Sequence, residues 1–405
     1  MQKTVLFIGG GIETVPGVVL AREMGLRVVV SDRNSKAPCF RHADAALIAD
    51  TYSADENIAA AQAFNRDHGP IHGVLCLATD VPLTVARTAK ALGLPGLDVE
   101  TARLAMDKLA MKDRFAQRGV RIPWYSQVQS ADALKTMVRE RPNPLVLKPV
   151  DSRGARGVMR LSGQVDLDWA FDYAKKFSPT GRVMVEEYLA GPQISTESLM
   201  IHGEAVTPGF SDRNYEFLET YQPFFIENGG DMPSFLDAAT QEKTRSLAAD
   251  AARALGIKNG VAKGDLVVRD GVPYVIEMAA RLSGGYFCTH SIPLNTGVEL
   301  VRYAIMQALG EPIDPDLLKP RKQNHVCQRY LFPKPGRVVS IEGFEEVQAR
   351  PHIALCEVRF QIGDIIADVE NHPGRAGVLT ALGSSREEAL ANAEDAVRCI
   401  NIKTV

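Results

Sequence analysis

The sequence contains few cysteines, and they follow no pattern that would join them. Only 6 of the 405 residues are cysteine, and no two of them form a CxxC pair. Structural zinc sites and disulfide frameworks need cysteines at defined spacings, whereas scattered thiols are typical of a reducing compartment. We therefore expect no structural zinc, no disulfide framework and a cytoplasmic location.

Long apolar runs and clusters of basic residues are missing as well. The first apolar segment, in MQKTVLFIGGG, is only as long as a strand, and glycines follow it instead of a small-residue cleavage site. No uninterrupted apolar stretch reaches membrane-spanning length. Lysine and arginine number 46 against 49 acidic residues, which gives a net charge of -3 with no basic run. We expect no signal peptide, no membrane partner and no nucleic-acid partner.

A familiar dinucleotide-binding pattern is incomplete. Gly9, Gly10 and Gly11 follow an apolar strand, and Asp32 ends the next strand. A GxGxxG motif that starts at Gly9 would, however, need glycine where Thr14 stands. A nicotinamide-dependent oxidoreductase is therefore kept only as an alternative, because Asp32 is equally well explained as the polar end of a strand.

The chain does have the composition of a globular protein with several cores. Hydrophobic residues make up 45% and charged residues 23% of the sequence, and 405 residues exceed what one ordinary core accommodates. The first 97 residues alternate between strands and helices, which predicts a parallel α/β sheet. The expected strands cover 4–8, 27–31, 45–48 and 73–78, and the expected helices cover 16–24, 53–64 and 81–92.

The rest of the chain predicts two α+β units and a small last region. One helix is expected over 99–118, with Lys108 and Lys112 one turn apart on the same face, and we assign Lys112 to a solvent-exposed face. The irregular, aromatic-rich segment 212–235 is expected to be a lid or binding loop. The further strands are expected at 182–187, 193–201, 204–211, 260–269, 272–278, 337–341, 355–361 and 378–382, and the further helices at 166–177, 237–255, 297–309 and 386–400. We therefore divide the chain into four units, at 1–97, 98–190, 191–320 and 321–405.

The stretch PLVLKPVDSRGARGV joins an apolar strand to a polar loop with glycines. The strand delivers Lys148, whose charge makes burial costly unless an anion meets it. Ser152, Gly154 and Gly157 then allow a tight turn that directs several backbone N–H groups toward one point. This is not a P-loop, in which the lysine follows the glycines. We interpret the stretch as a phosphate-binding loop with Lys148 as its cation, and the alternative is an ordinary hairpin.

Three acidic residues occupy strands that are otherwise apolar, namely Glu186, Asp265 and Glu277. If the dipeptide Asp270-Gly271 turns a hairpin, Asp265 and Glu277 become near neighbours across its two strands. Their mutual repulsion favours a divalent cation, and Mg²⁺, with Mn²⁺ as the alternative, suits two carboxylates and nucleotide phosphates. The other interpretation is a hairpin whose acids face solvent.

Five motifs in this order resemble the ATP-grasp enzymes of the carboxylate-amine ligase type, such as L-amino acid ligases and relatives of biotin carboxylase and of the purine pathway. These motifs are LAMDKLAMKDRF, LVLKPVDSRGARGV, VEEYLAGP, GDLVV and VIEMAARLSGG. The resemblance covers nearly the whole chain. It implies an N-terminal Rossmann-like parallel sheet, a central ATP-grasp of two α+β subdomains and a small C-terminal α+β subdomain. It also implies a homodimer.

The resemblance assigns roles to individual residues. Asp265 and Glu277 match the magnesium carboxylates, and Arg281 matches the arginine that steadies an acyl phosphate, with Lys148 as a second catalytic residue. The residues that match ATP contacts are Lys108, Lys148, Ser152, Gly154, Gly157, Glu186, Glu187, Tyr188, Leu189 and Gln193. The candidate residues of the substrate pocket are Arg213, Glu227, Ser283, Gly284, Gly285 and His290.

Within this pocket, Glu227 could hold an ammonium group, and Arg281 with the Ser283 to Gly285 turn could receive a carboxylate. The alternatives are that Arg213 and Glu227 are ordinary surface charges, and that His290 is a structural histidine, which we prefer to a catalytic base.

Two positions depart from the pattern of the family. Gln193 stands where a ribose-binding glutamate is common, and Ala279 stands where asparagine often adds a metal ligand. Glutamine still hydrogen-bonds a hydroxyl, but alanine cannot bind a metal, so water or Glu197 would have to fill the coordination of a second ion.

The expected reaction is ATP-dependent ligation of a small-molecule carboxylate, activated as an acyl phosphate, to an amine such as an amino acid. The alternatives are a purine-pathway or biotin-carboxylase-like enzyme, and a catalytically silent ATP-binding regulatory protein. Ala279 favours the last of these, because alanine cannot bind a metal.

Overall fold

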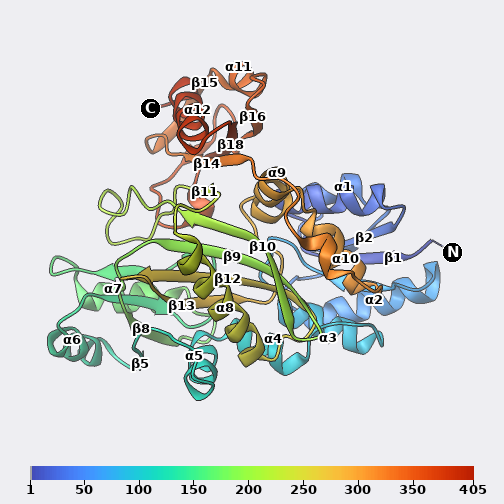
Figure 1. The fold of residues 1–405 in the computed structure, drawn as a ribbon, viewed down its shortest axis with the longest axis horizontal. Coiled ribbons are helices and arrows are strands. Elements are labelled where there is room, and N and C mark those ends of the chain that lie inside the picture. Colours follow the sequence, from blue (N-terminus) through green and yellow to red (C-terminus); the bar gives the residue numbers. More distant parts are fainter. Residues whose placement is uncertain (1) are drawn as a thin grey trace.

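In the computed structural model, which describes residues 2–405, the N-terminal unit is a four-stranded parallel sheet with the strand order β3-β2-β1-β4 (Figure 1). Its apolar strands are buried because helices cover a parallel sheet on its faces. The predicted α/β organisation is confirmed. Its elements are β1 (Thr4–Ile8), α1 (Val15–Glu23), β2 (Arg27–Asp32), β3 (Ala45–Ile48), α2 (Ala54–His68), β4 (Gly73–Leu75) and α3 (Pro82–Ala91).

The single helix predicted over 99–118 is wrong, because the structure has two helices, α4 (Val99–Met106) and α5 (Lys108–Gln117). Asp107 ends the first helix in an extended conformation and caps the second, its carboxylate accepting the N–H of Ala110 at 2.9 Å. Aspartate suits an N-cap because its oxygen satisfies an N–H that has no partner within the helix. The helical periodicity of the sequence continues across Asp107, so the sequence pattern did not reveal the break between the two helices.

A small four-stranded antiparallel sheet follows, with the order β5-β8-β6-β7. Two helices cover it, and the apolar side chains between them include Leu134, Leu147 and Phe171. The elements of this small sheet are β5 (Tyr125–Val128), α6 (Ala131–Glu140), β6 (Leu145–Pro149), β7 (Met159–Leu161), α7 (Leu167–Lys176) and β8 (Val183–Glu187). The predicted phosphate loop connects β6 to β7.

The largest sheet has eight antiparallel strands in the order β13-β12-β9-β10-β11-β14-β18-β16. Its first five strands are β9 (Gln193–Ile201), β10 (Glu204–Arg213), β11 (Gly230–Met232), β12 (Gly260–Arg269) and β13 (Val272–Ala279). Helix α8 (Ala238–Leu255) covers part of this sheet, and α4 and α5 pack into the same apolar cluster.

The C-terminal region continues this sheet instead of forming a detached unit (Figure 1). Its strands β14 (His325–Leu331), β18 (Gly377–Gly383) and β16 (Ile353–Val358) extend the eight-stranded sheet, and β14 pairs directly with β11. The sequence analysis predicted neither β11 nor β14. A second, three-stranded sheet contains β17 (Ile365–Ile366), β15 (Gly336–Glu342) and β19 (Asn401–Thr404), beside α11 (Phe344–Gln348) and α12 (Arg386–Cys399).

The segment between the two halves of the large sheet packs against the N-terminal unit. It contains a π-helical turn (Phe287–Ser291), α9 (Ile292–Thr296) and α10 (Leu300–Ala308), so the predicted helix over 297–309 begins three residues later than expected. Val301 and Ile305 of α10 join Phe7 and Val18 in one core cluster. The N-terminal unit and the large sheet therefore share a hydrophobic interface.

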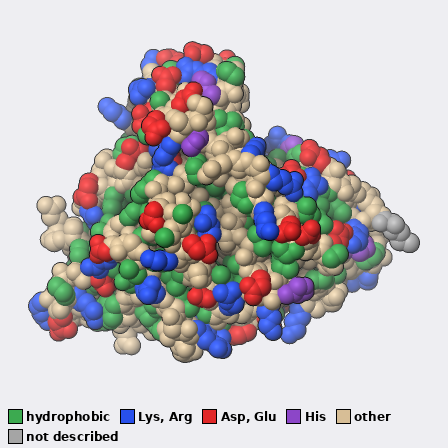
Figure 2. Space-filling view, in the orientation of Figure 1, with side chains coloured by type: hydrophobic (Ala, Val, Ile, Leu, Met, Phe, Trp, Pro, Cys, Tyr) green, Lys and Arg blue, Asp and Glu red, His purple; other side chains and the backbone are tan. Residues whose placement is uncertain are grey.

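The surface agrees with the balanced charge of the sequence. On the face shown in Figure 2, acidic and basic side chains are interspersed. Within residues 2–405, no helix combines the length and the apolar composition needed to cross a membrane.

Candidate active site

All four units border one cleft of about 590 Å³. Its walls come from the ends of the N-terminal strands, the β6–β7 loop, strands β9, β10, β12 and β13, and the C-terminal region. All the predicted site residues line it except Gly157 and His290. Gly157 lies at the base of the loop with φ +72°, where a Cβ atom would lie 2.8 Å from Pro149. His290 packs edge-on against the ring of Tyr286, which agrees with a structural role.

The predicted phosphate loop has the backbone of a tight concave turn. Gly154, Ala155 and Gly157 all have positive φ, which alanine adopts only at a cost. Lys108, at the start of α5, donates a hydrogen bond from Nζ to the carbonyl of Ser152 at 2.7 Å. Lys108 also forms an ion pair with Glu277 at 3.1 Å, so it links the loop to the predicted metal site.

Lys112 is buried, and its assignment to a solvent-exposed face was wrong. Its side chain is 2% exposed and pairs with the equally buried Glu186 at 2.9 Å, while Lys148 pairs with the other oxygen of Glu186. Burial lowers the pKa of Lys112. Burial alone would raise the pKa of Glu186, but the two lysines lower it below its ordinary value. Lys112 is buried by two strands, β8, which carries Glu186, and β13, whose Val275 carbonyl accepts from its Nζ. The sequence pattern of the helix does not reveal these distant contacts.

The Glu186 carboxylate pairs with two lysines in this structure, so its predicted contact with adenine would require it to share or exchange them. Its neighbours Glu187, Tyr188 and Leu189 continue past the end of β8 along the cleft. Their proposed contact with the adenine ring remains a prediction.

Asp265 and Glu277 face each other across the β12–β13 pair, as the Asp270-Gly271 turn predicted. Asp265 accepts contacts from Lys263 and from Arg213 Nη1, the latter at 2.7 Å, and Ser195 donates to it at 3.3 Å. Burial alone would raise the pKa of Asp265, but Arg213 and Lys263 hold it well below its ordinary value. Both acids offer oxygen ligands, and such a pair fits Mg²⁺ that completes its shell with water and phosphate oxygens.

A third protein ligand is not assembled around these acids. Ala279 has no ligating group, and the Glu197 carboxylate accepts both the N–H of Ser283, at 2.8 Å, and its hydroxyl. Among residues 2–405, no group of three potential metal-binding side chains was found. The described residues therefore fit a cation held by Asp265 and Glu277. Glu197 has a structural role instead, because its carboxylate is bound by Ser283.

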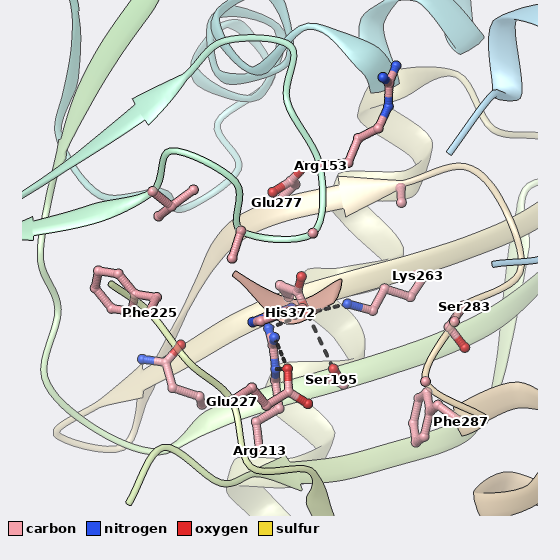
Figure 3. A pocket seen from close by; sticks show the side chains of 18 of the residues that line it. Arg153, Ser195, Arg213, Phe225, Glu227, Lys263, Glu277, Ser283, Phe287 and His372 are labelled. Carbon is pink, nitrogen blue, oxygen red and sulfur yellow. Dashed lines mark hydrogen bonds and ion pairs between the residues drawn. The ribbon is translucent and has the colours of Figure 1, made fainter. Parts of the chain in front are cut away.

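Arg213 and Glu227 are partners of each other, not separate surface charges. Arg213 donates to Glu227 through Nε at 3.1 Å and through Nη2, and both side chains line the cleft. Figure 3 shows Arg213 and Glu227 below His372, with Lys263 and Ser195 to the right of them. An ammonium group would thus have to share the Glu227 carboxylate with Arg213.

The predicted carboxylate-binding turn does hold a carboxylate, but it comes from the protein itself. Gly285 donates its N–H to Glu13 at 2.7 Å, and Arg359 pairs with the other Glu13 oxygen at 2.6 Å. Arg281 lies beside this turn and contacts Asp80 at 3.3 Å. These contacts join the N-terminal unit to the large sheet and to the C-terminal region.

The sequence analysis missed several residues of the cleft. Asp80 follows the last strand of the parallel sheet, and this position was a usable signal because ligands bind outside the carboxyl ends of parallel strands. The others gave no local signal, and they are Glu13, Lys263, Tyr330, Arg359, His372 and Arg375. The alternative of a dinucleotide site is not supported, since Asp32 accepts the N–H of Gly10 at 2.8 Å and so stabilises its own loop.

Three family models match the sequence. The ATP-grasp N-terminal domain matches residues 19–96, the ATP-grasp domain matches 105–285, and the L-amino acid ligase C-terminal domain 2 matches 329–405. Alanine--anticapsin ligase of Bacillus subtilis is 27% identical over 290 residues, which cover 65% of this chain and 60% of that protein. D-alanine--D-alanine ligase of Desulforudis audaxviator is 29% identical over 197 residues, which cover 47% of this chain and 63% of that protein. The chain thus spans less than two thirds of the length of either relative.

The fold resembles that of a solved ligase over its full length. The crystal structure of L-amino acid ligase from Bacillus licheniformis has a TM-score of 0.84 and 22% sequence identity, and the match covers 100% of this chain and 99% of that one. The three matched domains identify the chain as a member of the ATP-grasp superfamily, and its fold resembles that of an L-amino acid ligase.

Proposed function

We propose that this protein is an ADP-forming ligase that activates a carboxylate with ATP and joins it to an amine. One observation carries the proposal: the loop beside Lys148, the Asp265 and Glu277 pair, and Arg281 all border the same cleft. The names of the similar ligases, which act on amino acids, support amino acids as substrates of both kinds.

Each part of the cleft would perform one task in phosphoryl transfer. Lys108 and Lys148 would neutralise phosphate oxygens, which requires that they share or exchange their partners Glu277 and Glu186 when ATP binds. Asp265 and Glu277 would hold Mg²⁺, which when bound supplies positive charge to the transferring group. Arg281 would stabilise the charge that develops on the activated carboxylate.

The loop would protect the activated substrate from water. Its backbone N–H groups can fold over the phosphates, and a closed loop excludes the water that would hydrolyse an acyl phosphate. The amine then attacks the acyl carbon, phosphate leaves, and the amine gives up a proton as the amide bond forms.

The test is an assay of the full-length protein with ATP, Mg²⁺ and pooled amino acids, followed by measurement of ADP and phosphate and by mass spectrometry of products. We expect ADP release that needs both an acid and an amine, and a product whose mass equals the sum of the two substrates less one water. Release of AMP, or a product formed only with bicarbonate or with a ribose phosphate amine, would contradict the amino-acid assignment.

A second candidate is an ATP-binding protein without turnover. Ala279 and the engagement of Glu197 by Ser283 favour it, because they leave two carboxylates for the metal site. Tight ATP binding measured by calorimetry, without ADP release from any acid and amine, would establish this candidate instead. The expected homodimer also remains a prediction, which light scattering of the purified protein would test.

A further inference from the structure

Arg375 is a buried arginine held rigidly at the wall of the cleft. It follows the 3-10 turn His372–Gly374, directly before β18, and is 7% exposed. Its Nε donates to the carbonyl of His372 at 2.8 Å and its Nη1 to the carbonyl of Glu227 at 3.1 Å. Its guanidinium also lies 3.5 Å from the centre of the Tyr330 ring. The plane of the guanidinium is therefore fixed on three sides.

Arg375 lacks the acidic partner that the other cations around it have. Arg213, Arg281 and Lys263 each form an ion pair with a carboxylate, whereas within residues 2–405 no carboxylate forms one with Arg375. A guanidinium has five N–H donors, and only two of those of Arg375 have a recorded acceptor. A buried, unpaired cation is costly unless an anion meets it. The remaining donors at this wall suit the two oxygens of a carboxylate.

His372 adds a neutral polar group beside this cation. Burial, followed by the positive charge of Arg375, lowers the pKa of His372 to about 3, so the imidazole is uncharged near neutral pH. Its Nε2 atom is shielded from solvent and has no hydrogen-bond partner among the described residues. Figure 3 shows the ring above Arg213 and Glu227, inside the cleft. The turn therefore presents a single positive charge, that of Arg375, because His372 adds none.

The contacts connect Arg375 to Asp265 only through two intervening side chains. Asp265 pairs with Arg213, Arg213 pairs with Glu227, and only the backbone of Glu227 reaches Arg375. A carboxylate being phosphorylated must lie next to the metal and the γ-phosphate, whereas Arg375 lies two side chains beyond Asp265. It is better placed for a carboxylate that does not react.

We propose that Arg375, held by the His372–Gly374 turn, forms the subsite for the carboxylate that the amino-acid amine substrate retains. The inference rests on the proposed ligase function. Glu227, whose carboxylate keeps lone pairs beside Arg213, is then close enough along the same wall to accept from the amino group of that substrate.

The experiment uses the acid and amino-acid pair that gives the fastest ADP release, together with the carboxamide of the same amine donor. For the wild-type protein we expect the KM of the carboxamide to exceed that of the amino acid by about 10- to 100-fold, as charge-assisted hydrogen bonds imply. Arg375→Gln should raise the KM of the amino acid by a similar factor, and should leave the KM values of the carboxamide and of ATP nearly unchanged. Arg375→Lys should restore part of the preference for the amino acid.

Arg156→Gln is the matched control. Arg156 also lines the cleft without an ion pair in the described part of the chain, but it belongs to the phosphate loop. This variant should change the KM of ATP and keep the preference for the amino acid over its carboxamide.

Several outcomes would overturn the subsite. They are equal KM values for amino acid and carboxamide in the wild type, an equal rise for both in Arg375→Gln, and a rise confined to the acid that is activated. The wild-type comparison decides the question even if Arg375→Gln does not fold. If the wild type releases no ADP with any pair, the proposed function itself fails, and the subsite fails with it.

Discussion

Replacing Glu277 with glutamine is expected to lower Mg²⁺-dependent ADP formation by about a thousandfold, because metal-assisted charge stabilisation contributes several kcal/mol to such a transition state. Glu277 faces Asp265 across the hairpin, and the amide would remove one of the two charges that attract the cation. The fold should survive, since the Glu277 side chain is 32% exposed and Lys108 keeps its hydrogen bond to the Ser152 carbonyl. The measurement is kcat as a function of Mg²⁺ concentration, beside a thermal unfolding curve.

Asp270→Asn is the matched control for this prediction. Asp270 lies at the turn of the same hairpin, its side chain is 92% exposed, and asparagine tolerates its positive φ. This change from acid to amide should leave both turnover and Mg²⁺ dependence at wild-type values. Wild-type turnover in Glu277→Gln, or an equal loss in both variants, would remove Glu277 from the proposed metal site.

Replacing Glu186 with alanine is expected to lower the free energy of unfolding by about 3–5 kcal/mol, because it strands two buried cations. Lys112 and Lys148, with side chains 2% and 8% exposed, both pair with this one carboxylate. The two lysines lower the pKa of Glu186 in the folded protein below its ordinary value. Its charge therefore stabilises the fold fully above the ordinary carboxyl pKa, and this stabilisation is lost as the pH falls through the lowered pKa. Urea unfolding at neutral pH measures the effect, and the difference from wild type should shrink in acid.

The adjacent Glu187 provides the comparison. Its side chain is 20% exposed and pairs with the more exposed Arg269 at 3.3 Å. Glu187→Ala should therefore cost less than about 1 kcal/mol of stability. Equal losses for the two alanine variants would mean that the buried triad contributes nothing special to the fold.

The proximity of Asp265 and Glu277 was predictable because a short turn joins the two strands that carry them. The Asp270-Gly271 dipeptide identifies the turn and predicts that Asp265 and Glu277 are near neighbours. In the structure a bulge between Asp265 and Leu266 shifts the register and brings the two acids directly opposite each other. The parallel N-terminal sheet was predictable for another reason, the alternation of strands and helices, although its strand order, in which β3 and β4 lie at opposite edges, was not predicted.

Prediction failed where a partner came from a distant part of the chain. The helix carrying Lys112 looks amphipathic by itself, and only the approach of β8 and β13 buries that lysine. Arg375 and His372 enter the cleft through the pairing of β14 with β11, strands that local pattern did not reveal. Glu13 likewise reaches Gly285 only because the N-terminal unit packs on the large sheet. Local periodicity contains no information on such contacts.

The continuous eight-stranded sheet has a consequence for the order in which substrates enter. It ties the C-terminal region to the strands that carry Asp265 and Glu277, while the phosphate loop belongs to the separate small sheet. Few contacts join that small sheet to the turn before β18, among them the hydrogen bond from His372 N–H to the Gly154 carbonyl at 3.1 Å. If the small sheet moved away, the wall containing Arg375 would keep its shape and the predicted phosphate loop would separate from Asp265 and Glu277. We expect the amino-acid wall to be ready before ATP arrives, and ADP to leave only after the loop has lifted.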